Sequence, residues 1–276
     1  MRKITIKDVI DIPYDVVVKN ICNFVEGVIK ETNPRKIVIG LSGGLDSSTL
    51  LATLIHRMPV DLFVALIMPD SRITPREDVE DAIELAENYG VEYHVIYIDN
   101  IVDSYRVAPF YNQGDKLPLG NLRARIRMNL LYYYANKYAG MVVGTSDRSE
   151  LLLGYFTKYG DGASDIAPLG CLYKTQVREL ARRLGLPEKI INKPSAPRLW
   201  EDHLAEEELG YKYTEIDVAL YALFDLGLSV ERAVEMTDLP VELFKRVIEL
   251  HRKTRHKRRI PLIPGLPWLR EPIREI

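Results

Sequence analysis

Cysteine is scarce in this chain of 276 residues, and long apolar runs and an excess of one charge are missing. The two cysteines, Cys22 and Cys171, form no CxxC pair, which argues against a zinc knuckle or a redox pair. No segment approaches the ~20 apolar residues of a membrane span, and the first eight residues lack the apolar core of a signal peptide. A formal net charge of −2 argues against a nucleic-acid binder. We therefore expect a cytoplasmic protein without membrane or nucleic-acid partners.

Short apolar strands alternate with amphipathic helices along the first two thirds of the chain. Strands are expected at 36–41, 61–68, 91–98 and 141–144, and helices at 15–31, 46–57, 74–89, 117–138 and 175–184. Such alternation with continuously apolar strands is typical of a parallel sheet that is covered on both faces. We predict an α/β fold, with a doubly wound parallel sheet of about five strands and helices on both faces. Further helices follow at 214–226, 230–236 and 241–254.

The 276 residues are expected to form one domain, because 47% hydrophobic residues suffice for a normal core and no low-complexity linker interrupts the chain. Within it we expect an N-terminal helix (1–34), an α/β core (35–192) to which the motifs below assign nucleotide binding, a mobile loop (193–212), and C-terminal helices with a tail (213–276).

The first predicted strand runs directly into a Ser-Gly-Gly turn and a helix. Glycines let a backbone approach a phosphate, and the N–H groups at a helix start attract anions. Asp46 follows the glycines, and an acid there favours Mg²⁺ between it and a polyphosphate. No lysine follows, so this is not a GxxxxGK[ST] loop. The residues of this turn, which the resemblance described below assigns to ATP binding, are Gly40, Leu41, Ser42, Gly43, Gly44, Leu45, Asp46, Ser47 and Ser48. The alternative is an ordinary turn in which Asp46 caps a helix.

A second polar strand end lies at residues 144–150, after the fourth predicted strand. Glu150 falls in the first turns of the following helix, where its carboxylate could meet Mg²⁺ from the side opposite Asp46. The alternative is a capping box formed by Asp147 and Glu150.

Six segments, in order along nearly the whole chain, resemble one family or the superfamily that contains it. The SGGLDSS loop resembles the SGGxDS loop of ATP pyrophosphatases, and residues 154–169 (GYFTKYGDGASDIAPL) resemble the GFFTKYGDGGADxxPL signature of NAD synthetases. Residues 120–128, 172–176, 208–217 and 256–261 resemble the family's GNxKARxRM, LTKRQ, ELGxxYxxID and HKRxxP stretches. The chain thus resembles the ammonia-dependent NAD synthetases, whose fold is adenine nucleotide alpha hydrolase-like. That resemblance implies adenylation of the nicotinate carboxylate of deamido-NAD by ATP, followed by displacement of AMP by ammonia.

The resemblance also implies roles for individual residues. Asp46 and Glu150 match Mg²⁺ ligands, and Asp46, Lys174 and Asp161 are the predicted catalytic residues, with Asp161 binding ammonium or taking its proton. Further ATP contacts are implied for Thr145, Lys174 and Ser195. Contacts to deamido-NAD are implied for Arg125, Lys158, Asp165, His256 and Lys257.

Each of these residues also has an ordinary interpretation. Arg123, Arg125 and Arg127 cannot share one helix face, so at least one is expected to be a surface charge. Lys158 and Lys174 would by default be surface lysines, and residues 256–259 a solvated basic run. The chain departs from the family at Ile67, where relatives often carry an arginine; Arg72 is the candidate substitute.

Partners and competing functions complete the prediction. The ATP loop begins at Ser42, which leaves no room for a preceding glutaminase domain, so ammonia, either free or from a separate protein, is the expected nitrogen donor. A homodimer is expected. Competing hypotheses are a GMP synthetase subunit, a tRNA-thiolating enzyme and a non-catalytic nucleotide sensor.

Overall fold

The computed structural model describes residues 2–261 and 263–264. In this part of the chain, four parallel strands form one sheet in the order β3-β2-β1-β4. Their bounds are Lys36–Gly40 for β1, Phe63–Ile67 for β2, Glu92–Val95 for β3 and Gly140–Val143 for β4. A single parallel bridge joins Val143 to Ile166, where a fifth strand would lie. The doubly wound parallel α/β fold is therefore confirmed, with four strands and one bridge where about five strands were expected.

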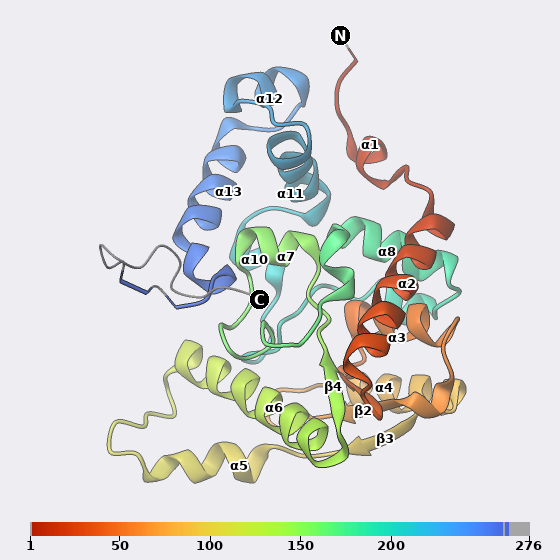
Figure 1. The fold of residues 1–276 in the computed structure, drawn as a ribbon. Helices are drawn as coiled ribbons and strands as arrows, with labels where there is room; N and C mark the ends of the chain where they lie inside the picture. Colours follow the sequence, from red (N-terminus) through yellow and green to blue (C-terminus); the bar gives the residue numbers. More distant parts are fainter. Residues whose placement is uncertain (1, 262, 265–276) are drawn as a thin grey trace.

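Alternating side chains of the strands enter two different cores. Ile37 and Ile39 of β1 pack on one face, while Val38 packs on the other, as the two-residue period of a strand requires. The first face is covered by α2 (Tyr14–Thr32), α3 (Leu45–Ile55), α4 (Arg76–Tyr89), α8 (Lys174–Arg183) and α9 (Glu188–Ile191). The second is covered by α5 (Asp99–Ser104) and α6 (Lys116–Tyr138), which lie away from α2 and α3 (Figure 1).

A third core unites the C-terminal helices with the chain's N-terminus. It contains apolar residues of α1 (Ile6–Ile10), α11 (Tyr213–Leu220), α12 (Val230–Met236) and α13 (Val241–Lys253). A π-helix, Tyr221–Asp225, continues α11. Figure 1 shows α11, α12 and α13 grouped beside α7 (Arg148–Leu153) and α10 (Ala205–Leu209).

One buried carboxylate links this helical layer to the helices α7 and α8. Asp217 of α11 accepts hydrogen bonds from the Ser149 hydroxyl (2.6 Å), the Thr175 amide (2.8 Å) and the Thr175 hydroxyl (2.7 Å). Burial raises the pKa of Asp217 to about 7. Since Ser149 lies on α7 and Thr175 on α8, one side chain joins three helices.

Most helices agree with the expected positions within one or two residues, but the third strand is shorter than expected. It ends at Val95, and α5 begins at Asp99, because edge strand β3 has a neighbour on one side only and its Glu92 and His94 are exposed. The expected loop 193–212 contains α10. Single-turn 3₁₀ helices occupy Val60–Leu62, Tyr105–Val107, Pro168–Cys171 and Arg255–Arg258. Among the described helices, none has the length and apolarity that a bilayer crossing needs. The end of the expected C-terminal tail lies outside the described residues.

Candidate active site

The turn between β1 and α3 is built so tightly that one of its positions requires glycine. Gly43 has φ of +73°, and a Cβ there would lie 2.0 Å from the carbonyl oxygen of Asp78 on α4. The Ser47 hydroxyl accepts a hydrogen bond from the Ser42 amide (3.2 Å) and lies 3.0 Å from the Ser42 hydroxyl. These contacts fix the turn at the N-terminus of α3, which is the geometry of an anion site.

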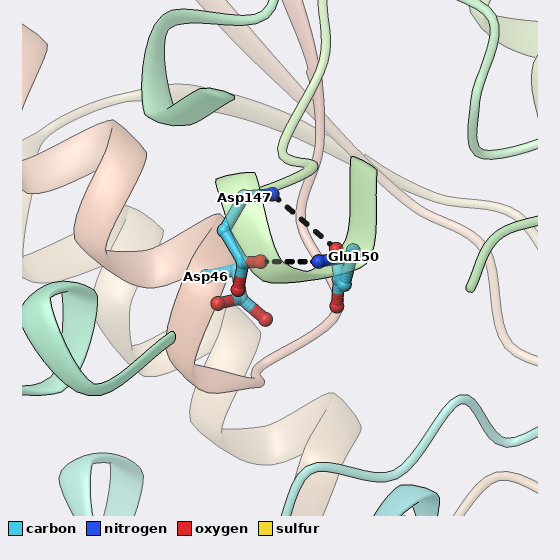
Figure 2. A group of neighbouring side chains, drawn as sticks. All are labelled: Asp46, Asp147 and Glu150. Carbon is cyan, nitrogen blue, oxygen red and sulfur yellow. Dashed lines mark hydrogen bonds between the residues drawn. The ribbon is translucent and has the colours of Figure 1, made fainter. Parts of the chain in front are cut away.

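Three carboxylates meet beside this turn (Figure 2). Asp46 comes from α3, Asp147 precedes α7 as its N-cap, and Glu150 lies in the first turn of α7. One oxygen of each lies within 4.8 Å of the others. The capping box is present as well, since Asp147 accepts from the Glu150 amide (2.8 Å) and Glu150 accepts from the Asp147 amide (3.3 Å). The cap and the acidic cluster, which the sequence presents as alternatives, therefore coexist.

Lys174 places its ammonium group among these three acids. Its Nζ lies 2.8 Å from Asp46 Oδ2, 2.8 Å from Asp147 Oδ2 and 2.7 Å from Glu150 Oε1. The side chain is only 1% exposed. Burial works to lower the pKa of Lys174, but the three carboxylates outweigh it and hold that pKa well above its usual value. Lys174 is therefore a buried cation of the site, and the interpretation as a surface lysine is wrong.

The cluster retains capacity for a further cation. Three carboxylates face one ammonium, and burial raises the pKa values of Asp147 and Glu150 despite Lys174 nearby. Asp46 Oδ1 is buried without a hydrogen-bond partner among the described residues. Carboxylate oxygens are the ligands that Mg²⁺ prefers. The donor set, the surplus negative charge and the unpaired oxygen together fit a divalent cation.

The turn and the cluster open into one cavity of about 610 Å³, a size typical of small-molecule sites. The predicted residues that line it are Gly40, Leu41, Ser42, Gly44, Leu45, Asp46, Thr145, Glu150, Asp161, Lys174, Ser195 and Lys257. Lys257 donates hydrogen bonds to the carbonyls of Gly154 (2.7 Å) and Phe156 (2.6 Å), and Asp161 accepts one from the Thr157 amide (2.9 Å).

Other predicted residues lie outside the cavity wall. Arg125 is exposed and donates to the Lys158 carbonyl (3.3 Å), and His256 is exposed on the short helix after α13. The Asp165 carboxylate accepts hydrogen bonds from the Val142 amide (2.7 Å) and the Tyr132 hydroxyl (3.1 Å), so it pairs with a backbone amide of β4. Gly43, Ser47, Ser48 and Lys158 are also absent from the lining, although the first three shape the turn.

Two arginines that the motif comparison does not single out face inward from α6. Arg127 lines the cavity and donates to the Met68 carbonyl (2.8 Å); burial lowers its pKa to about 10. Arg123 pairs with buried Asp70 (2.7 Å) and donates to the Leu199 carbonyl (3.2 Å). Residues four apart share one face of a helix, so the i, i+4 spacing of these arginines could have predicted that they face the same way.

Arg72, the candidate substitute for the family arginine, is held elsewhere. Its guanidinium contacts Asp70 (2.7 Å) and Asp103 (2.8 Å), and it does not line the cavity.

Residues 193–204, named the lid here, pack against the turn between β1 and α3. The Lys193 amine donates to the Gly43 carbonyl (2.9 Å) and to Asp78 (2.7 Å), and Arg198 also pairs with Asp78 (3.2 Å). The Ala205 amide closes the base of the lid on the Ser195 carbonyl (2.8 Å). The lid is therefore attached to the wall that shapes the turn. Its mobility stays a prediction.

Comparison with known proteins agrees with this geometry. A family model described as NAD synthase matches residues 17–261. The chain belongs to the NAD synthase family. It is 57% identical to the NH(3)-dependent NAD(+) synthetase of Staphylothermus marinus, over 99% of both chains.

Two solved structures of NAD synthase-like proteins share the fold. One is the NMN synthetase of Francisella tularensis, with a TM-score of 0.80 and 32% identity over 93% of this chain and all of that one. The other is the NH3-dependent NAD synthetase of Campylobacter jejuni, with a TM-score of 0.77 and 31% identity over 92% of this chain and all of that one.

Proposed function

We propose that this member of the NAD synthase family amidates deamido-NAD with ammonia. ATP first adenylates the nicotinate carboxylate and releases pyrophosphate. Ammonia then attacks the acyl carbon and displaces AMP, which leaves the amide of NAD. The observation that carries the proposal is the cluster of three carboxylates around Lys174, which shares one cavity with a phosphate-binding turn. Membership of the family and 57% identity to an ammonia-dependent enzyme support it.

The ATP side of the cavity is assigned to the turn and the cluster. We assign residues 40–48 to the triphosphate, and Thr145 and Ser195 to further contacts with ATP. Asp46 and Glu150, with Asp147, would hold Mg²⁺, which neutralises polyphosphate charge when it is bound. Lys174 already lies between those acids, so its ammonium is placed to stabilise charge that develops on the α-phosphate.

The deamido-NAD side is assigned to a second part of the cavity wall. Lys257 and Asp161 line it, and Asp161 would bind ammonium there. Arg125, Lys158, Asp165 and His256 lie outside the cavity of this protomer, so we propose that they meet the dinucleotide at the interface of a homodimer. The whole chain would act as a single catalytic domain, with the lid closing over ATP and ammonia entering directly or from a separate protein.

Product analysis tests the proposal. Purified protein is incubated with Mg²⁺-ATP and deamido-NAD, with ammonium, with glutamine, or with neither. We expect NAD, AMP and pyrophosphate with ammonium alone. Formation of NAD from glutamine in ammonium-free buffer would overturn the assignment of the nitrogen donor. Failure to form NAD under every condition, with ATP still bound, would favour a nucleotide sensor.

The identity of the nucleotide needs its own arm, because one structural neighbour is described as an NMN synthetase. Nicotinate mononucleotide replaces deamido-NAD in a parallel reaction, and we expect the dinucleotide to give the higher kcat/KM. A preference for the mononucleotide would reassign the substrate. Asp46→Asn should abolish turnover, whereas the matched control Asp61→Asn, at an exposed position in the 3₁₀ helix Val60–Leu62, should not.

A further inference from the structure

A second group of polar side chains lies at the cavity wall, apart from the acidic cluster. The Nε2 atom of His203 lies 2.7 Å from Glu208 Oε2 and 3.3 Å from the Tyr155 hydroxyl, which itself donates to Glu208 (2.6 Å). All three residues line the cavity. The motif comparison assigns no role to any of them.

These contacts orient the imidazole of His203. An ionised carboxylate only accepts hydrogen bonds, so the proton of a neutral ring lies on Nε2, toward Glu208. Burial opposes ionisation of Glu208, but hydrogen bonds from Tyr155 and His203 outweigh it and lower the pKa of that carboxyl. The Nδ1 atom then carries the lone pair. A carboxylate that holds one ring nitrogen while the other accepts a proton is the arrangement of a general base.

The Nδ1 atom of His203 has no partner. The side chain is 3% exposed, and Nδ1 is buried without a hydrogen bond to any described residue. A buried polar atom that has no hydrogen bond destabilises a protein. His203 lines the cavity, and a hydrogen-bond donor of a bound molecule there would satisfy this atom.

Hydrogen bonds connect this group to residues that are assigned to each of the two substrates. The Tyr155 amide donates to the Glu150 carbonyl (2.9 Å), which joins this group to the helix of the acidic cluster. Lys257, on the deamido-NAD wall, donates to the carbonyls of Gly154 and Phe156, the two neighbours of Tyr155. The Lys257 ammonium is attracted to both Asp161 and Glu208. His203 is thus linked through Tyr155 both to α7, which carries Glu150, and to the segment that holds Lys257.

We propose that His203 is the general base of the amidation step, with Glu208 as its positioning residue; this rests on the proposed function. Ammonium gives one proton to His203 Nδ1 and becomes ammonia. The nitrogen lone pair forms a bond to the acyl carbon of the adenylated nicotinate, and the carbonyl electrons move onto oxygen. These electrons return as the carbon–oxygen bond to AMP breaks, and AMP leaves with that electron pair. As the carbon–oxygen bond breaks, the nitrogen gives its second proton to the phosphate of the departing AMP, and His203 returns the first proton to solvent when the lid opens.

The position of His203 in the lid gives a reason for its burial. His203 belongs to the lid, and its ring stacks on Trp200 with centroids 3.6 Å apart. Lid closure would therefore bring the base to the adenylate and exclude water from it at the same time. Water is the competing nucleophile that would hydrolyse the adenylate, so delivery of the base by the lid favours amidation over hydrolysis.

The test separates the two half-reactions in His203→Gln, whose amide can still donate to Glu208. Adenylation is followed as ATP–pyrophosphate exchange with deamido-NAD and without ammonium. Amidation is followed as NAD formation, with either ammonium or hydroxylamine as the nitrogen donor. Hydroxylamine is mostly unprotonated at neutral pH, so it needs the base less. The control is His56→Gln, at an exposed position at the far end of α3.

We expect exchange to stay unchanged in His203→Gln, while ammonium-dependent kcat falls about 10²–10⁴-fold, the usual contribution of a general base. The loss with hydroxylamine should be much smaller, and Glu208→Gln should impair the same step. The assignment would be overturned if His203→Gln formed NAD at the wild-type rate, or if it lost exchange and amidation equally. If His203→Gln does not fold, His203→Asn carries the same readouts. No NAD from the wild type would instead refute the proposed function.

Discussion

Replacement of Lys174 by methionine tests the electrostatic design of the site. Lys174→Met keeps a long apolar stem and removes the one ammonium group that lies among Asp46, Asp147 and Glu150. Without it, three carboxylate oxygens within 4.8 Å of one another have no cation between them. We expect a folded but strongly destabilised protein whose stability depends on divalent cations.

The magnitude follows from the distances. A unit-charge pair about 2.8 Å apart gains about 6 kcal/mol at an effective dielectric constant of about 20. Desolvation of the ammonium offsets much of this gain, and removal of one partner from a buried ion pair destabilises proteins by about 3–5 kcal/mol. At about 2–4 °C per kcal/mol, the expected fall in Tm is about 6–20 °C.

Thermal unfolding with and without MgCl₂ measures the effect. Magnesium should raise the Tm of Lys174→Met more than that of the wild type, because the ion no longer competes with the ammonium and stabilises only the folded state. The deficit should shrink at low pH, since protonation of Asp147 and Glu150 relieves their repulsion. The control Lys189→Met removes a half-exposed ion pair with Asp81 and Glu84 and should leave the Tm nearly unchanged. A Tm equal to that of the wild type, with no added response to magnesium, would refute the reasoning.

Three further predictions concern the turn, the lid and the buried acid on α11. Gly43→Ala should weaken ATP binding and lower the Tm, because its Cβ would overlap the Asp78 carbonyl. The control Gly27→Ala, inside α2, places its Cβ in open space and should be neutral or stabilising. Isothermal titration and thermal unfolding measure both variants, and undiminished ATP affinity in Gly43→Ala would contradict this account of the turn. Lys193→Ala should raise the KM for ATP and speed proteolysis within 193–204, while Lys189→Ala on α9 should not; equal cleavage rates would show that Lys193 does not hold the lid. Asp217 has a folded-state pKa near 7, above the ordinary 3.8. The native state then binds the extra proton, so this residue's contribution to stability is full below about pH 4 and lost as pH rises to about 7. Asp217→Asn should flatten that part of the Tm–pH profile, and an unchanged slope would count against the assigned pKa.

Local patterns predict the sheet well because burial of a strand leaves a direct trace in the sequence. Ile37, Val38 and Ile39 are all apolar since β1 is covered on both faces, and the Ser-Gly-Gly turn after it marks the strand end by its composition alone. Edge strand β3 leaves a weaker trace, because Glu92 and His94 face solvent. Its end was accordingly predicted three residues too late.

Tertiary proximity explains what the sequence could not predict. Lys174 becomes a buried cation only because the ends of β1 and β4 bring Asp46 and Glu150 to it. No local sequence pattern predicts this contact. The phase of α6 was undetermined, since Arg123 and Arg127 face inward while Arg125 faces out, so charge does not mark the exposed face. The acidic run before Leu209 suggests a loop, but burial of Ala205 and Leu209 makes it α10.

The side chain of Asp217 couples the stability of the acidic cluster around Lys174 to the layer of C-terminal helices. Glu150 and Lys174 lie next to the two residues that Asp217 holds, Ser149 and Thr175. Local opening of α11 would release both, so amide hydrogens of α7, α8 and α11 should exchange with deuterium as one cooperative unit. The C-terminal helices, which contribute little to the cavity wall, thereby affect how often the acidic cluster opens.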